Sequence, residues 1–147
     1  MVFLGINVFF LQQGICSDDA DEIHVVLGTE HALLPVYIAP LRGSETDLSQ
    51  EYLAQISAVL TFDMNHNGMT YVIDGKEKEI LQKNLGAFGY DDVFPLELAK
   101  ENSLSYVICW RVCQKTLEAK VIQVTSGTVR TLSPVTLCSD LSKDRRK

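Results

Sequence analysis

Side chains that could carry out acid–base, nucleophilic or metal chemistry are few in this chain and are scattered along it. The three histidines, His24, His31 and His66, lie far apart in sequence. None belongs to an H-E-x-x-H zinc motif, and there is no G-x-S-x-G elbow, P-loop or Rossmann glycine fingerprint. A local hydrogen bond beside a predicted helix end accounts for the pair Asp63 and His66. We therefore predict no catalytic residue, no bound metal and no cofactor.

The cysteines and the acidic pair Asp91-Asp92 do not form a recognisable site either. The chain has 4 cysteines, and removal of Cys16 with a leader would leave an odd number. Cys109 and Cys113 share one face of a predicted strand at a separation of about 13 Å, too far for a disulfide in a straight strand. We expect buried free thiols for most of them. The acidic pair lacks the oxygen-rich repeat of a calcium loop.

The charge balance argues against a nucleic-acid-binding function. The net charge is −6 and the isoelectric point is about 5.0, whereas nucleic-acid binders normally carry a basic face. Basic residues gather only at the C-terminus, as Lys143, Arg145, Arg146 and Lys147. We interpret this group as the solvated end of a helix, although a site for an anionic partner is the alternative.

The N-terminus has the composition of a signal peptide. Residues 1–16 contain no charged side chain, and residues 1–11 form an apolar run that is too short to span a bilayer. Gly14 and Cys16 provide small residues before a cleavage site at Ser17. No Lys or Arg precedes the run, so a buried strand or helix is the alternative. A lipid-modified Cys16 is disfavoured because Ile15 stands where a lipoprotein signal has a small residue.

Residues 17–30 are predicted to form a mobile acidic segment with a first strand. Residues 17–22 hold four acidic side chains in six positions, a composition that favours mobility near a terminus. Residues 22–27 are β-like. A second strand is expected at residues 35–41, where apolar and other residues alternate.

The strongest helix signal covers residues 48–64. Leu48, Tyr52, Ile56 and Leu60 recur every fourth residue and form one apolar stripe. Thr46 or Asp47 is the predicted N-cap, with Gln50 three residues after Asp47 as in a capping box. Gly68 is expected to supply the left-handed stop after the helix.

Further elements alternate along the rest of the chain. We predict a strand at residues 69–73, a weaker helix at 76–85 with Ile80, Leu81 and Leu85 on its apolar side, and a short helix beginning at Pro95. Three strands at residues 106–113, 117–124 and 128–135 should form an antiparallel meander, in which Trp110 has core-facing parity.

Together these elements predict a mixed α/β (α+β) fold. We expect a two-layer structure in which two main helices pack on a mixed sheet of about five strands, with a right-handed parallel crossover between residues 35 and 73. Residues 31–138 form this domain. Residues 139–147 resemble the start of a linker helix, capped by Ser139 or Asp140, in which nothing after Leu141 can be buried.

The order of these motifs resembles the N-terminal domain of the TolB family. The first block is Val36-Tyr37-Ile38-Ala39-Pro40-Leu41, followed by the helix containing Ile56 and by Asp63-Met64-Asn65-His66-Asn67-Gly68. A second block runs from Ala99 to Tyr106-Val107-Ile108, and a third is Asp144-Arg145-Arg146. The resemblance covers residues 22–147.

The sequence departs from the family pattern at three points. Asn67-Gly68 stands where the family has a Ser-Gly pair, and Cys109-Trp110 stands where a Gly follows the strand opening. The repeats of the family's β-propeller do not follow within these 147 residues. We therefore expect this chain to be an incomplete version of a longer protein.

The resemblance implies a non-catalytic periplasmic role in protein–protein interaction. TolB-like proteins link the inner-membrane protein TolA to the outer-membrane lipoprotein Pal, for envelope integrity and cell division. By resemblance, the TolA side is served by the N-terminal segment and this domain, and Pal by the missing propeller. The corresponding partner-binding residues here would be Ser17, Asp18, Asp19, Asp21, Glu22 and His24.

Two other classes of function remain open at this point. A small-ligand-binding or adaptor domain of the envelope would be favoured by a preformed apolar pocket between helix and sheet. An envelope hydrolase would require an acid, a base and a nucleophile that converge in one pocket.

Overall fold

The computed structural model describes residues 32–41 and 46–145. The predicted signal peptide, the acidic segment with its strand at residues 22–27, and the residues Arg146 and Lys147 lie outside the described residues.

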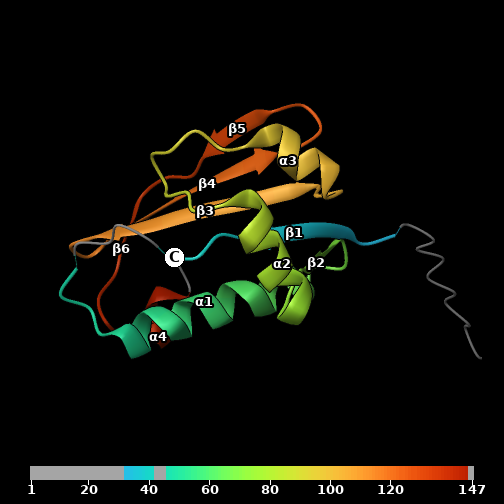
Figure 1. The fold of residues 1–147 in the computed structure, drawn as a ribbon. Coiled ribbons are helices and arrows are strands. Elements are labelled where there is room, and N and C mark those ends of the chain that lie inside the picture. The colour runs from blue at the N-terminus through green and yellow to red at the C-terminus, as the bar shows by residue number, and fades with distance from the viewer. Residues whose placement is uncertain (1–31, 42–45, 146–147) are drawn as a thin grey trace, which may run out of the picture.

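The fold is a mixed sheet with helices packed on it (Figure 1). Its strands are β1 (Leu34–Ile38), β2 (Thr70–Val72), β3 (Tyr106–Cys113), β4 (Thr116–Gln123), β5 (Thr128–Thr131) and β6 (Val135–Thr136). The strand order is β2-β1-β3-β4-β5, and β6 pairs with β4. β1 is parallel to both of its neighbours, whereas β3, β4 and β5 form an antiparallel meander, as predicted.

The helices are α1 (Gln50–Asn65), α2 (Gly75–Leu85), α3 (Leu96–Glu101) and α4 (Leu141–Asp144). The path from β1 to β2 runs in one direction along the sheet, and the path from β2 to β3 runs back past β1. Right-handed crossovers in opposite directions place their helices on opposite faces. The fold class is confirmed, with one difference: helices lie on both faces rather than in one layer.

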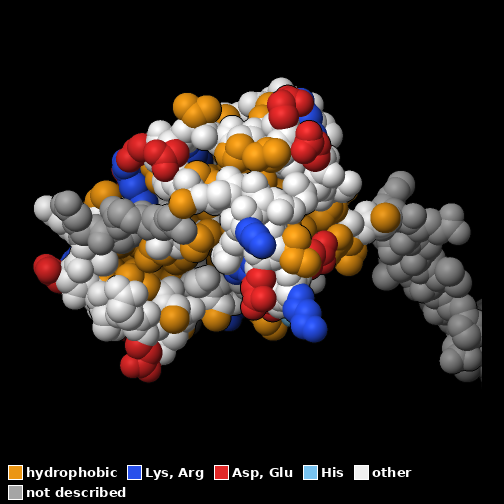
Figure 2. Space-filling model, viewed as in Figure 1, with side chains coloured by type: hydrophobic (Ala, Val, Ile, Leu, Met, Phe, Trp, Pro, Cys, Tyr) orange, Lys and Arg blue, Asp and Glu red, His pale blue; other side chains and the backbone are white. Residues whose placement is uncertain are grey.

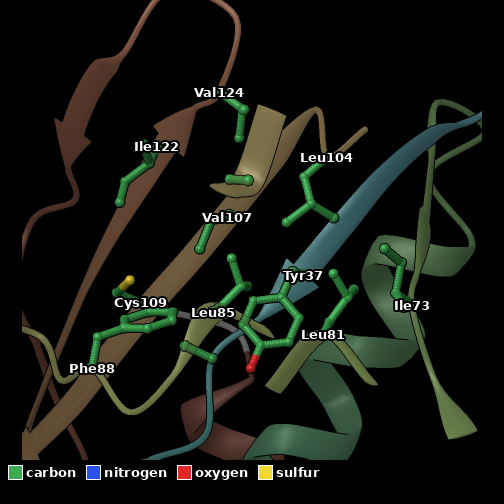
Figure 3. Close-up of a cluster of buried hydrophobic side chains, with 12 residues drawn as sticks. Tyr37, Ile73, Leu81, Leu85, Phe88, Leu104, Val107, Cys109, Ile122 and Val124 are labelled. Atoms are coloured by element: carbon green, nitrogen blue, oxygen red, sulfur yellow. The ribbon is translucent and has the colours of Figure 1, made fainter. Parts of the chain in front are cut away.

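Two hydrophobic clusters lie on the two faces of the sheet, because alternate residues of β3 belong to different clusters. Val107 and Cys109 face α2 and α3, while Ile108 and Trp110 face α1. In Figure 3 the ring of Tyr37 lies among Leu81, Leu85 and Phe88, within the cluster on the α2 face. Trp110 is buried, as its parity in the sequence predicted.

The start of α1 differs from the prediction. Ser49 is the N-cap, and the backbone N–H of Tyr52 donates to its hydroxyl at 3.2 Å. The Thr46 hydroxyl accepts instead from the N–H of Leu48 at 3.2 Å. The prediction of Thr46 or Asp47 as the N-cap is therefore wrong. Leu48 is buried in the segment before the helix, and the helix begins only after Ser49. Gly68 follows the helix with φ of 74°, the left-handed conformation expected there.

Two further expectations need correction. Ile80 is 60% exposed, because the buried stripe of α2 is formed by Leu81 and Leu85 alone. The strand predicted at residues 128–135 is interrupted, with β5 ending at Thr131 and β6 beginning at Val135. Pro134 lies in the interruption and has no N–H to donate to a ladder.

Within residues 32–41 and 46–145, no helix combines the length and the apolar character that crossing a membrane requires.

Candidate functional site

One face of the sheet remains apolar beyond the area that α1 covers. Ile108 of β3 pairs with Val121 of β4, and Trp110 pairs with Ala119. Val121 in turn pairs with Arg130 of β5. Directly paired residues project to the same side of a sheet. These apolar side chains therefore continue under and past α1 toward the β5 edge.

A cavity of about 430 Å³ lies between α1 and this face. Its lining residues are Leu34, Val36, Ile56, Leu60, Met64, Asn67, Met69, Thr70, Tyr106, Ile108, Trp110, Leu117, Ala119, Val121 and Leu132. The three residues from α1 lie one helical turn apart and form one wall. A preformed apolar cavity between helix and sheet is the feature that we expected of a ligand-binding domain.

Polar atoms in the lining are mostly occupied by local hydrogen bonds. The side-chain oxygen Oδ1 of Asn67 accepts from the backbone N–H groups of Met69 and Thr70 at 2.8 and 2.9 Å. The Asn67 amide donates to the Thr70 hydroxyl at 2.8 Å, and that hydroxyl donates to Met64 O at 2.6 Å. The Trp110 indole N–H donates to Ala39 O at 3.0 Å. The cavity therefore presents carbon to whatever enters it.

A smaller cavity of about 190 Å³ continues along α1 toward α4. Ile56, Leu60 and Leu117 line both cavities, so these side chains lie between the two. Leu141 and Arg145 line the far end of the smaller cavity.

The C-terminal helix α4 is attached to α1, contrary to our expectation that little could hold it. The Tyr52 hydroxyl donates to the Asp144 carboxylate, which also accepts from the Cys138 N–H at 2.9 Å. Arg145 Nη2 lies 2.9 Å from Asp63 Oδ1. Burial, together with the Asp144 carboxylate, raises the pKa of Tyr52. Asp140 caps the helix as predicted, through the N–H groups of residues 142 and 143.

The residues considered for acid–base chemistry do not converge in the described structure. His66 is exposed and stacks on Phe62, and its Nδ1 lies 2.7 Å from Phe62 O. The Asp63 carboxylate pairs with Arg145, not with His66. Asp91 pairs with Arg111 on the opposite side of the sheet from α1. No group of three His, Cys, Asp or Glu side chains within the described ranges could hold a metal ion.

The described cysteines are free thiols in different environments. Cys109 is buried, and burial raises its pKa to about 11. Cys113 is half-buried, and Cys138 is exposed with its Sγ 3.2 Å from Asp144 Oδ1. The expectation of buried thiols is thus confirmed for Cys109 and wrong for Cys138, because residue 138 lies outside the strands.

The predicted partner-binding residues Ser17, Asp18, Asp19, Asp21, Glu22 and His24 lie outside the described residues. β1 is the first strand among the described residues, and Leu34 at its start lines the cavity. On the face shown in Figure 2, acidic and basic side chains are interspersed and do not gather into a patch of one sign.

Sequence reasoning did not anticipate the cavity. A signal was present, because Leu117, Ala119 and Val121 alternate along β4 while only two long helices are available to cover the sheet.

Comparison with known proteins gives one relative in sequence and several in fold. A protein TolB homolog of Protochlamydia amoebophila (strain UWE25) is 33% identical over 130 residues, which cover 88% of this chain and 27% of that protein. This chain therefore spans about a quarter of its relative's length. No protein-family model matches the chain.

Among solved structures, TolB from Acinetobacter baumannii matches with a TM-score of 0.54 at 11% identity, covering 75% of this chain and 24% of that one. The C-terminal domain of LpoB from Salmonella enterica matches with a TM-score of 0.50 at 14% identity, covering 74% of this chain and 87% of that domain. These likenesses concern the fold. The resemblance to the N-terminal domain of TolB is confirmed by the sequence and fold matches together.

Proposed function

Because this chain is similar to TolB in sequence and in fold, we propose that it is a non-catalytic interaction domain of the periplasm that binds a TolA-like inner-membrane protein. The observation that carries the proposal is the 33% identity to a TolB homolog over 88% of the chain. A likeness of fold alone would not support a shared role, because one fold hosts many functions.

The proposed contact uses the acidic segment at residues 17–30. Its side chains suit a basic partner, and an extended segment can add a strand to the edge of a partner's sheet. Charge complementarity of this kind mainly accelerates association and selects the partner. The described domain would then serve as the rigid body to which the segment is attached.

The link to the lipoprotein Pal is a proposal about a longer protein. The TolB homolog is about four times as long as the matched region, since that region covers 27% of it. We assign the Pal side to sequence that these 147 residues do not include. These 147 residues should bind a TolA-like protein.

Charge reversal in the segment tests the proposal. In the full chain, Asp18→Lys with Asp19→Lys should weaken binding to the periplasmic part of a TolA-type protein, measured by isothermal titration calorimetry. The matched control is Glu77→Lys with Glu79→Lys, because both residues are exposed on α2. Equal affinity for the two double variants would contradict a role for the segment. A change in melting temperature would show that the segment acts through the fold instead.

A second candidate function follows from the cavity under α1. Its volume of about 430 Å³ and its apolar lining favour the binding of a small apolar ligand. The two functions use different parts of the chain, so one can fail without the other.

A further inference from the structure

The cavity under α1 has the size and lining of a site for hydrocarbon. Ligand sites commonly measure roughly 300–1,000 Å³, and this cavity holds about 430 Å³. Asn67, Thr70 and Trp110 direct their polar atoms to other parts of the protein. Tyr106 alone brings to the lining a polar group that bonds to none of the described residues. A guest inside this cavity can therefore carry almost no polar atoms of its own.

The shape of the cavity favours an elongated ligand over a compact one. Ile56, Leu60 and Met64 extend along α1 for about 12 Å, from the helical rise of about 1.5 Å per residue. The smaller cavity lies beside this one, next to the shared residues Ile56, Leu60 and Leu117. Met64 and Met69 stand at the opposite end, where flexible thioether side chains can adapt to a chain of variable length.

Among the described residues, Arg130 is a cation that lies beside the site. Arg130 pairs with Val121 across β4 and β5, and Val121 lines the cavity, so both side chains project from the same face. Leu132, two residues further on that face, also lines the cavity and is 51% exposed. Arg130 is exposed, and it forms no ion pair with any described residue.

The other charges near the site compensate one another. Asp63 and Arg145, which line the smaller cavity, pair at 2.9 Å. The Asp144 carboxylate is engaged by Tyr52 and by the Cys138 N–H. Among the described residues, the charge of Arg130 at the β5 edge of the apolar site thus remains uncompensated.

We propose that this site binds a single-chain amphiphile with an anionic head, whose aliphatic chain fills the cavity under α1 while its head lies at Arg130. The inference deepens the second candidate function, and it is independent of binding to a TolA-like protein. A free fatty acid and a lysophospholipid share this chemistry, and the experiment below distinguishes between them.

The single tryptophan of the chain makes the site directly observable. Trp110 lines the cavity, and the sequence contains no other Trp. Titration of the full chain with myristate, or with lysophosphatidylglycerol, below the micellar concentration should shift its fluorescence to the blue in a saturable manner. Stronger binding of one probe shows whether the natural ligand is a free fatty acid or a lysophospholipid. Calorimetry gives an affinity that does not depend on the fluorophore.

Two variants test separately the cavity that would hold the aliphatic chain of the ligand and the residue that would bind its anionic head. Ala119→Leu narrows the cavity and should lower the affinity for myristate by about tenfold. Arg130→Gln should lower the affinity for myristate about fivefold at low salt. At high salt the variant and the unmodified protein should bind myristate equally. Lys83→Gln is the matched control, because Lys83 is exposed on α2 and should have no effect. The melting temperature of Ala119→Leu verifies that the variant is folded.

Each contrary result has a distinct meaning. If tetradecanol binds as tightly as myristate, the anionic head is refuted while apolar ligand binding stands. If no probe shifts the fluorescence and none gives a binding signal in calorimetry, both the amphiphile and the second candidate function are refuted. A blue shift that depends on protein concentration, together with a dimer in gel filtration, would assign the site to a second copy of the chain. A designed acidic amphipathic peptide that binds where myristate does not would assign it to a protein partner.

Discussion

On one face of the sheet, α2, α3 and the aromatic residues between them cover a cluster whose buried members are each at most 6% exposed. Val107 and Ala99 in that cluster are 0% exposed. On the other face, α1 meets the same strands but leaves a cavity of about 430 Å³ over β3 and β4.

The difference arises from how many elements cover each face. The α2 side receives two helices and a connecting segment in which Phe88 and Phe94 pack edge to face at 5.1 Å. Among the described residues, the α1 side receives one long helix, and the short helix α4 lines the smaller cavity but not the larger one. Close packing is needed for stability, whereas a binding site needs space. We infer that the α2 face maintains the fold and that the α1 face is available for binding.

The largest expected effect compares the same truncation on the two faces. Leu81→Ala on the closed face should reduce the free energy of unfolding by about 3 kcal/mol, because Leu81 is buried in a packed cluster. Leu60→Ala should cost about 1 kcal/mol, because Leu60 is half-buried and already lies at a cavity. Urea denaturation measures both losses. Equal losses would show that the faces do not differ in packing.

A second prediction tests how well the closed face excludes water. Burial raises the pKa of Cys109 from 9.0 to about 11, so the unfolded chain releases the thiol proton first as pH rises. Stability present below pH 9 should therefore be lost between pH 9 and 11, by roughly 2 kcal/mol. The Cys109→Ala variant should not show this loss of unfolding free energy between pH 9 and 11. Parallel stability curves for the two proteins in this range would mean that water reaches the thiol.

The comparison of faces also shows what the sequence could predict. The alternation in β3 identified Trp110 as a core residue, and the stripe through Tyr52 and Leu60 identified α1. Periodicity reports which side of an element is apolar, and this suffices for the order and type of the elements.

Periodicity does not report how elements fit against each other. Whether α1 covers β4 depends on its placement across the sheet, and the cavity follows from that placement. The attachment of α4 depends on a hydrogen bond between Tyr52 and Asp144, 92 residues apart. The break after β5 could have been predicted, because Pro134 lay inside the proposed strand.

A third prediction concerns the attachment of α4 to the open face. Tyr52→Phe removes the hydroxyl that donates to Asp144 and should lower the free energy of unfolding by about 1 kcal/mol. Amide exchange in α4 should rise more than exchange in β3. Tyr71→Phe is the control, since Tyr71 lies on β2, is exposed and has no hydrogen bond to a described residue. If α4 exchanges at the same rate in both variants, the hydroxyl does not hold it.

The smallest expected effect is the gain in stability when Ala119 is enlarged beside the cavity, and enlargement of Ala99 on the other face, which should have the opposite sign, is its comparison. Ala119→Val adds two methyl groups beside the cavity, at a strand position that favours β-branched residues. It should stabilise the protein by about 0.5 kcal/mol, since the added carbon fills space and displaces no neighbour. Ala99→Val adds the same volume to a residue with 0% exposure, where overpacking should cost about 1–3 kcal/mol. Thermal denaturation of the two variants beside the unmodified chain measures both shifts. A loss in both would mean that the α1 side is packed as tightly as the α2 side. A gain for Ala119→Val alone would mean that the cavity persists in solution, because only unoccupied space can accept a larger side chain without strain.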